Sequence, residues 1–157
     1  MSIKLLGVFL ILLSGVSGVA YTARAERKRL AVLDAWIELI RLIRGQIDLF
    51  LMPLDEILGT ADKRIFSVLG VQGSHVDMQA LLASSAPYLE KDCHRHLTTL
   101  VRELGGSYRE EQLRCCDHCL VQIQAAREEL GKHLPARLKT KGAMILCAAM
   151  GVALLLW

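Results

Sequence analysis

The chain has 157 residues, a length that suits one domain with a sizeable core and some additional segments. Hydrophobic residues make up 53% of the sequence, more than soluble domains usually carry, so part of the chain is expected to lie in a membrane. The net charge of +3 is small, and no run of lysine and arginine is interleaved with aromatic residues, which argues against nucleic acid as a partner.

An uncharged apolar stretch near the start of the sequence runs from Leu5 to Ala23 and is nineteen residues long. At about 1.5 Å per residue, a helix of that length just spans a hydrocarbon core of roughly 30 Å. The small residues Ser14, Gly15 and Gly18 share a face, which would either let another helix approach closely or reflect only the tolerance of small residues in lipid. We therefore predict an N-terminal transmembrane helix over residues 1–23.

The same stretch has an alternative interpretation as a signal peptide, because Ala23-Arg24-Ala25 resembles a cleavage site. The charges favour an uncleaved anchor, since only Lys4 precedes the apolar stretch and basic residues mark the cytoplasmic side of a membrane helix. If the stretch were cleaved, the product would be a secreted helical protein. The basic residues that follow the stretch are Arg24, Arg27, Lys28 and Arg29.

A second apolar stretch covers residues 142–157 and is predicted to be a C-terminal transmembrane helix. Trp157 suits a membrane interface, and lysine side chains at the other end can extend to the aqueous side. Both segments give the same orientation, with residues 24–141 as a cytoplasmic domain and both termini extracytoplasmic. The basic residues before the second segment are Arg137, Lys139 and Lys141.

The region after Leu30 has the three-and-four spacing of an amphipathic helix. Its apolar positions are Leu33, Trp36, Ile37, Ile40, Ile43, Ile47, Phe50 and Leu51. Pro53 interrupts this pattern, and a new helix with Asp55 and Glu56 near its start is expected there.

Three further helices are expected between that point and the second membrane segment. Residues 70–74 favour a loop, a shorter helix follows from about Asp77, and Pro87 is expected to open another that ends at Leu104. Gly105 and Gly106 stop it, and Ser107 with Glu110 forms a capping box for a last helix to about Lys141. No strand pattern occurs, so we predict an all-α protein: a cytoplasmic antiparallel helical bundle flanked by the two transmembrane helices.

The last helix carries three of the five cysteines, and their spacing favours a structural role. Cys116 lies in the middle of an apolar stripe, Cys119 flanks it, Cys115 is nearer its edge, and His118 projects to nearly the opposite side. Buried cysteine behaves as a small hydrophobic residue. We therefore predict that these thiols fill the core and remain reduced. The stripe consists of Leu113, Cys116, Leu120, Ile123, Leu130 and Leu134.

The alternative is a small membrane-anchored thiol- or metal-binding protein that uses the Cys115–Cys119 cluster. Structural zinc needs four ligands, and Cys93, His94 and His96 on the preceding helix could supply the others. The redox motif Cys-x-x-Cys belongs in a strand-to-helix setting that this sequence lacks.

The remaining sequence offers no catalytic motif: it has no phosphate-binding glycine loop, nucleophile elbow or histidine-glutamate zinc motif. We predict that the chain is not an enzyme, needs no cofactor and takes no small-molecule substrate. Arg127 lies on the apolar stripe of the last helix, which leaves three interpretations: an extended aliphatic stem, a buried ion pair, or a partner contact.

The order of these features resembles stage III sporulation protein AB of endospore-forming bacteria. The stretches IKLLGVFLILLSGVSG and TKGAMILCAAMGVALLLW are similar to that family's two membrane helices. RLAVLDAWIELIRLIRGQI and MPLDEIL resemble its first long helix and proline-leucine turn, and LGGSYREEQL resembles its leucine-glycine motif. Tyr108 stands where the family usually has aspartate. The matching motif residues are Pro53, Leu54, Leu104, Gly105, Ser107 and Gln112.

The resemblance implies a non-enzymatic protein of the mother-cell (outer forespore) membrane that acts in the secretion-like channel between mother cell and forespore. Its cytoplasmic domain would be similar to the platform proteins of type II secretion and type IV pilus machines. The implied partners are membrane lipid, a secretion-type ATPase and other channel components. The exposed faces of the first and last long helices are the candidate partner surface, represented by Arg41, Asp48, Arg114 and Glu128.

Overall fold

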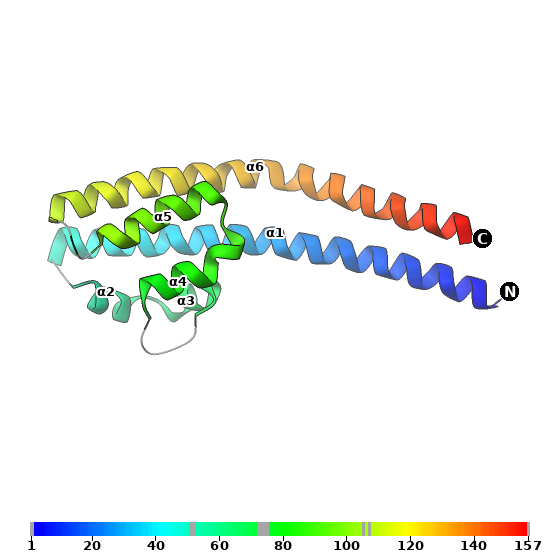
Figure 1. Ribbon diagram of the computed structural model, residues 1–157, viewed down its shortest axis with the longest axis horizontal. Helices are drawn as coiled ribbons and strands as arrows, with labels where there is room; N and C mark the ends of the chain where they lie inside the picture. Colours follow the sequence, from blue (N-terminus) through cyan, green and yellow to red (C-terminus); the bar gives the residue numbers. More distant parts are fainter. Residues whose placement is uncertain (1, 51–52, 72–75, 105, 107, 157) are drawn as a thin grey trace. The chain divides into compact units, whose positions relative to one another are not determined.

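A computed structural model of the chain describes residues 2–50, 53–71, 76–104, 106 and 108–156, except for the side chains at 2–16, 50, 137, 141, 146, 149 and 153–156. The described residues form helices and connecting turns and include no strand, which confirms the all-α prediction. The elements are α1 (Ser2–Phe50), α2 (Leu54–Thr60), α3 (Lys63–Leu69), α4 (Met78–Ser85), a 3-10 turn (Ala86–Tyr88), α5 (Lys91–Glu103) and α6 (Arg109–Leu156) (Figure 1).

The chain divides into two compact units. The central unit is Arg29–Glu129, and the terminal unit combines Met1–Lys28 with Leu130–Trp157. Both long helices contribute to both units. The unit boundaries lie inside the domain predicted for residues 24–141, because residues 24–28 and 130–141 cluster with the terminal segments.

Pro53 introduces α2 as expected, since its carbonyl accepts hydrogen bonds from the backbone N–H groups of Glu56 and Ile57, both at 3.1 Å. The sequence interpretation missed the division between α2 and α3. Asp62 marks it, because its carboxylate accepts a hydrogen bond from the backbone N–H of Arg64 at 2.8 Å and so caps α3. Gly70 then ends α3 with a φ of 90°, a left-handed conformation that suits glycine.

One predicted helix start is wrong in detail. Pro87 lies in the 3-10 turn, and α5 begins only at Lys91, after Leu89 and Glu90 adopt extended backbone. The first turn of α6 is organised by Tyr108, whose carbonyl accepts hydrogen bonds from Glu111 and Gln112, both at 3.0 Å. Ser107, Gly105 and residues 72–74 lie outside the described residues.

The core of the central unit is built around α1. The six described positions of its predicted stripe, Leu33 to Ile47, are all buried, and Val32, Ala35 and Leu39 are buried with them. The predicted positions Phe50 and Leu51 lie outside the described side chains. At ~100° per residue these buried positions cover an arc of about 200°, roughly twice the width of an ordinary amphipathic stripe.

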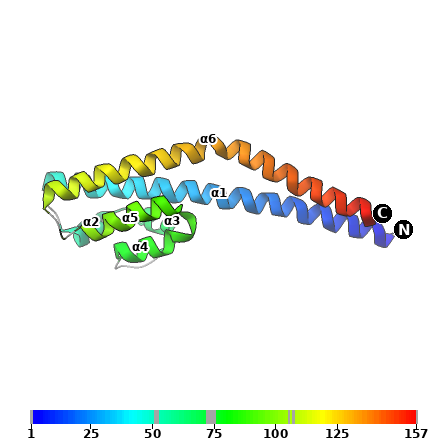
Figure 2. The same cartoon turned by 45° about the horizontal axis from the view of Figure 1, so that its top comes forward.

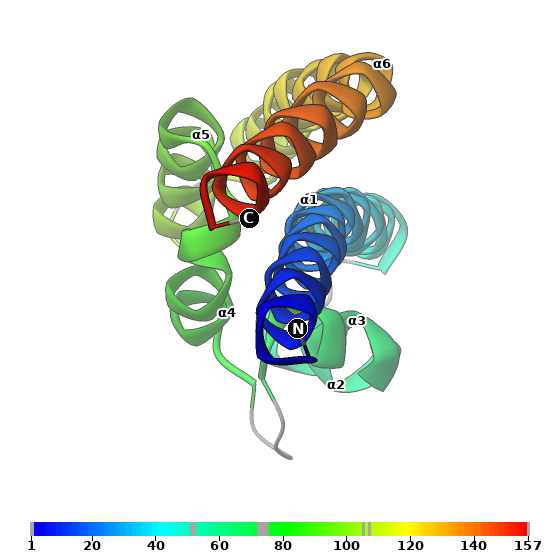
Figure 3. The ribbon, with the colours of Figure 1, turned by 90° about the vertical axis from the view of Figure 1, so that its right-hand side faces the viewer.

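The other helices of the central unit surround that arc. Figure 3 looks along the helices and shows α3, α4, α5 and α6 placed around α1. Figures 1 and 2 both show α1 and α6 side by side and antiparallel within this unit. Each surrounding helix contributes buried residues: Ile65, Phe66 and Leu69 from α3, Met78, Leu81 and Leu82 from α4, Cys93, Leu97 and Leu100 from α5, and Cys116, Cys119, Leu120 and Ile123 from α6.

Trp36 is fully buried and has one polar atom to satisfy. Its Nε1–H donates a hydrogen bond to Oγ of Ser85 on α4 at 3.1 Å. The Ser85 hydroxyl in turn donates to the carbonyl of Leu81 at 2.8 Å. This buried chain of two hydrogen bonds fixes how α4 sits against α1.

In the terminal unit, the two long helices approach each other at glycines. A Cβ added at Gly18 would lie 3.7 Å from Cγ2 of Ile145, and one added at Gly142 would lie 3.5 Å from Cγ1 of Val19. Gly18, expected from the sequence to permit a close approach, therefore does face another helix. In the part of the chain that the structure describes, no helix combines the length and apolar character that crossing a membrane requires.

We predict that Ser85→Ala lowers the free energy of unfolding by about 1–3 kcal/mol, because it leaves the buried Trp36 N–H without an acceptor. The measurement is chemical denaturation followed by circular dichroism. Ser67→Ala, at an exposed position of α3, is the control and should change stability by less than about 0.5 kcal/mol. Equal effects of the two substitutions would contradict the assigned role of Ser85.

Candidate functional site

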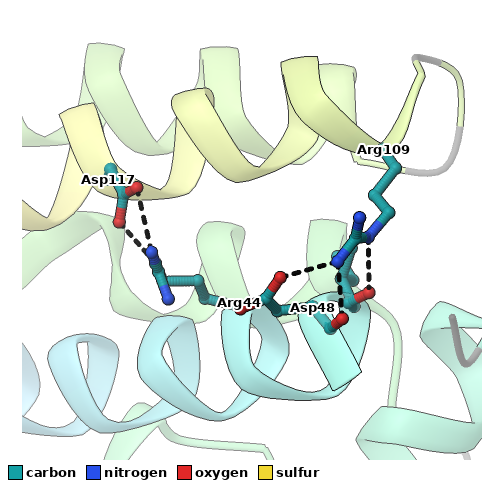
Figure 4. Close-up of polar contacts among 5 residues, drawn as sticks. Arg44, Asp48, Arg109 and Asp117 are labelled. Carbon is teal, nitrogen blue, oxygen red and sulfur yellow. Dashed lines mark hydrogen bonds and ion pairs between the residues drawn. The ribbon is translucent and has the colours of Figure 1, made fainter. Parts of the chain in front are cut away.

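Ion pairs join α1 and α6 along the central unit. Nε of Arg44 donates to Oδ1 of Asp117, and its Nη2 donates to Oδ2 at 3.3 Å (Figure 4). The Asp117 carboxylate, through the hydrogen bond and its charge, raises the pKa of the Arg44 guanidinium. Both side chains are partly solvent-exposed, so the pair contributes more to alignment than to stability.

Arg109, the first residue of α6, caps the end of α1 (Figure 4). Its Nη2 donates to the backbone carbonyl of Asp48 at 2.6 Å and to the Asp48 carboxylate at 2.7 Å, and its Nε donates to the carbonyl of Ile47 at 3.4 Å. Carbonyls in the last turn of a helix have no partner within the helix. A cation there also interacts favourably with the helix dipole, so Arg109 satisfies both requirements.

Arg127 forms the third pair, with Nε donating to Oδ1 of Asp34 on α1 at 2.8 Å. Of the interpretations that the sequence left open, an ion pair is correct, but the pair is not buried: the side chains are 46% and 51% exposed. The hydrogen bond and charge of Asp34 raise the pKa of the Arg127 guanidinium.

The four residues of the candidate partner surface are all exposed. Arg41 and Asp48 lie on α1, and Arg114 and Glu128 lie on α6. Asp48 is already engaged by Arg109, so it belongs to the contact between the two helices as well as to the surface. Arg41 and Arg114 are therefore better probes of a partner.

The family-motif residues serve mainly in chain turns and the core. Pro53 is exposed before α2, Leu54 and Gln112 are half-buried, and Leu104 is buried at the end of α5. Gly105 and Ser107 lie outside the described residues. Among the membrane-flanking basic residues, Arg24, Arg27, Lys28 and Lys139 are exposed and Arg29 is half-buried, while the side chains of Arg137 and Lys141 are outside the description.

The cysteines are placed largely as the stripe predicted. Cys116 is fully buried, Cys119 is 2% exposed, Cys115 is half-buried, and His118 is exposed. Burial raises the pKa of the Cys116 and Cys119 thiols to about 12 in each case. Thiols with such pKa values stay protonated at neutral pH, so they are poor nucleophiles and poor metal ligands. Burial also raises the pKa values of Cys93 and Cys115.

The ligands of the alternative zinc centre are not brought together among the described residues. Among the described residues, no group of three or more histidine, cysteine, aspartate or glutamate side chains could hold a metal ion. The structure does bring together two of the residues considered for it. The rings of His96 on α5 and His118 on α6 lie with centroids 5.6 Å apart and planes inclined by 71°.

Sequence reasoning missed the roles of Arg44, Arg109 and Asp117. A signal existed for Arg109, because it lies seven residues before Cys116 and so shares the face of α6 that carries the apolar stripe. A charge on an apolar stripe requires a partner or an extended stem. Nothing in the local sequence of Arg44 or Asp117 identifies the other, because they are 73 positions apart.

Comparisons with known proteins identify no relative: no family model, curated protein or solved structure matches this chain. Membership of the family that the sequence motifs resemble is therefore a proposal.

We predict that Cys116→Ala lowers the free energy of unfolding by about 1–2 kcal/mol, through lost packing in the core. His118→Ala, in metal-free buffer, should change it by less than about 0.5 kcal/mol because the side chain is exposed. Denaturant titration of both variants tests this. If His118→Ala were the more damaging change, the assignment of Cys116 to the core would be wrong.

Proposed function

We propose that this chain is a non-enzymatic membrane platform component of a secretion-like channel. In this role it couples a cytoplasmic ATPase to the membrane complex in sporulating bacteria, as the resemblance to stage III sporulation protein AB implies. The observation that carries the proposal is the layout of the chain. Two uncharged apolar segments, each with basic residues on its inner side, bracket a helical domain that lacks a catalytic motif.

The charged faces of α1 and α6 in the central unit support a coupling role. Arg41 and Arg114 are exposed on these helices, whereas the opposite sides of the same helices are occupied by core residues. Charged residues at a surface govern the encounter and specificity of a protein partner. The helices that offer these charges also carry the proposed membrane segments, so binding there would act directly on the anchors.

The burial of the thiols argues against the alternative function as a thiol- or metal-binding protein that uses the cysteine cluster. Redox cysteines have lowered pKa values and accessible sulfur atoms, whereas burial raises the pKa of both Cys116 and Cys119 to about 12.

We predict a topology in which residues 24–141 face the cytoplasm and both termini face outward. Val121 is exposed on α6, so Val121→Cys should be labelled by a membrane-impermeant maleimide only after cell lysis. Ser2→Cys should be labelled in intact cells. The wild-type chain measures background labelling of the native cysteines. Labelling of Val121→Cys in intact cells would show that the predicted orientation is wrong. Recovery of a mature chain that begins after Ala23 would favour the secreted alternative.

We predict that the full-length chain in detergent binds a secretion-type ATPase and that the combined Arg41→Glu and Arg114→Glu changes weaken binding about tenfold or more, equivalent to 1.4 kcal/mol. The loss should shrink between low and high salt, because exposed charges are screened. Binding is measured by titration at two salt concentrations.

The matched control is Lys91→Glu, a charge reversal at an exposed position of α5. It should leave both the affinity and the fold near wild type, since surface changes usually cost little. Absence of wild-type binding at either salt, with assembled ATPase, would remove direct coupling from the proposal. Equal weakening by Lys91→Glu would show that the effect follows net charge and not this surface.

A further inference from the structure

Two histidines from different helices meet at the surface of the central unit. His96 on α5 is half-buried and His118 on α6 is exposed, and their ring centroids are 5.6 Å apart. The residues come from elements that are separated in the chain by the turn before α6. Their contact is therefore made by the fold and is not a consequence of neighbouring positions in one helix.

The spacing of the rings is close to that of two imidazoles bound to one metal ion. Zinc–nitrogen bonds are about 2.0–2.1 Å long, so two imidazoles at a tetrahedral ion have ring centroids roughly 5 Å apart. The two rings now make an edge-to-face contact, so binding one ion would also require them to rotate until a nitrogen of each points at the ion. We propose that His96 and His118 form an open, two-histidine site for a divalent transition-metal ion.

The ligand set defines the class of metal. Neutral imidazole suits zinc, nickel and copper, whereas magnesium and calcium prefer oxygen ligands. Among the described residues, no group of three or more histidine, cysteine or carboxylate side chains could hold a metal ion, so water would occupy the remaining coordination positions of the proposed site. Cys115, one turn before His118, is half-buried, and burial raises the pKa of its thiol, which disfavours the thiolate form that binds metal.

A metal bound there would join α5 to α6. Because it would bind the folded arrangement and not the separated helices, it should raise the unfolding midpoint, and the midpoint should keep rising with the logarithm of the metal concentration above the dissociation constant. This property is independent of the proposed partner and requires no membrane function.

The test uses the full-length chain in detergent, titrated with zinc and separately with nickel by calorimetry, after removal of adventitious metal. His96→Ala and His118→Ala remove one ligand each. His94→Ala is the matched control, because His94 lies on the same helix as His96 and contacts Thr98 within that helix. Cys115→Ser tests for a thiol contribution.

The wild-type chain should bind one ion per chain and show a raised unfolding midpoint. Each ligand variant should lose about tenfold or more in affinity, since even supporting residues around a metal cost 10–100-fold when removed. His94→Ala and Cys115→Ser should bind like the wild type. The proposal is overturned if the wild type shows no saturable binding, if His96→Ala or His118→Ala binds normally, or if Cys115→Ser alone abolishes binding.

Discussion

The central unit depends on one constraint, which is that α1 must be covered on more than half of its circumference. Its buried residues extend from Val32 to Ile47 and include Trp36, which is too large to leave partly covered without losing much apolar burial. One neighbouring helix cannot shield an arc of about 200°, so α3, α4, α5 and α6 all contribute. The short helices and the turns between them allow the chain to pack around α1. The bond from Trp36 to Ser85 then specifies where α4 lies.

The contact between α1 and α6 combines an apolar seam with charges that fix its register. Three charged residues of α1 are paired with α6 and follow one another along the chain as Asp34, Arg44 and Asp48. Their partners, in the same order, are Arg127, Asp117 and Arg109, which have the opposite signs and descend along the antiparallel α6. If α1 slipped by one turn, about four residues, Asp48 would take the place of Arg44 opposite Asp117 and two carboxylates would meet. Each exposed pair stabilises little and a like-charge contact costs a similar amount, so the three pairs together favour the observed register over the slipped one by a small sum.

The parts of this structure that the sequence predicts are those governed by local periodicity. The stripe from Leu33 to Ile47, the thiol positions at Cys116 and Cys119, and the helix after Pro53 follow from spacing and turn chemistry alone. The extra burial of Ala35 and Leu39 does not, because it depends on how many helices surround α1. Contacts such as Arg109 to the end of α1, or His96 to His118, are also beyond local patterns. They depend on the register between helices, which is set by the whole core.

The central unit has an unreactive core and places its charged and histidine side chains at the surface, an arrangement that suits a scaffold. The thiols of Cys116 and Cys119 are buried, and burial raises their pKa values to about 12, so these two core cysteines are unreactive at neutral pH. Its remaining chemistry lies at the surface, in the exposed charges of α1 and α6 and in the histidine pair that links α5 to α6. A partner that binds Arg41 and Arg114 would engage both long helices at once, whereas a metal at the histidines would hold α5 against one of them. Arg114 and His118 are four residues apart on α6 and share a face of that helix, so the two contacts are neighbours that differ in their chemistry. The proposed partner contact would respond to salt and the proposed metal contact to metal concentration, and their proximity on α6 means that each could affect the other.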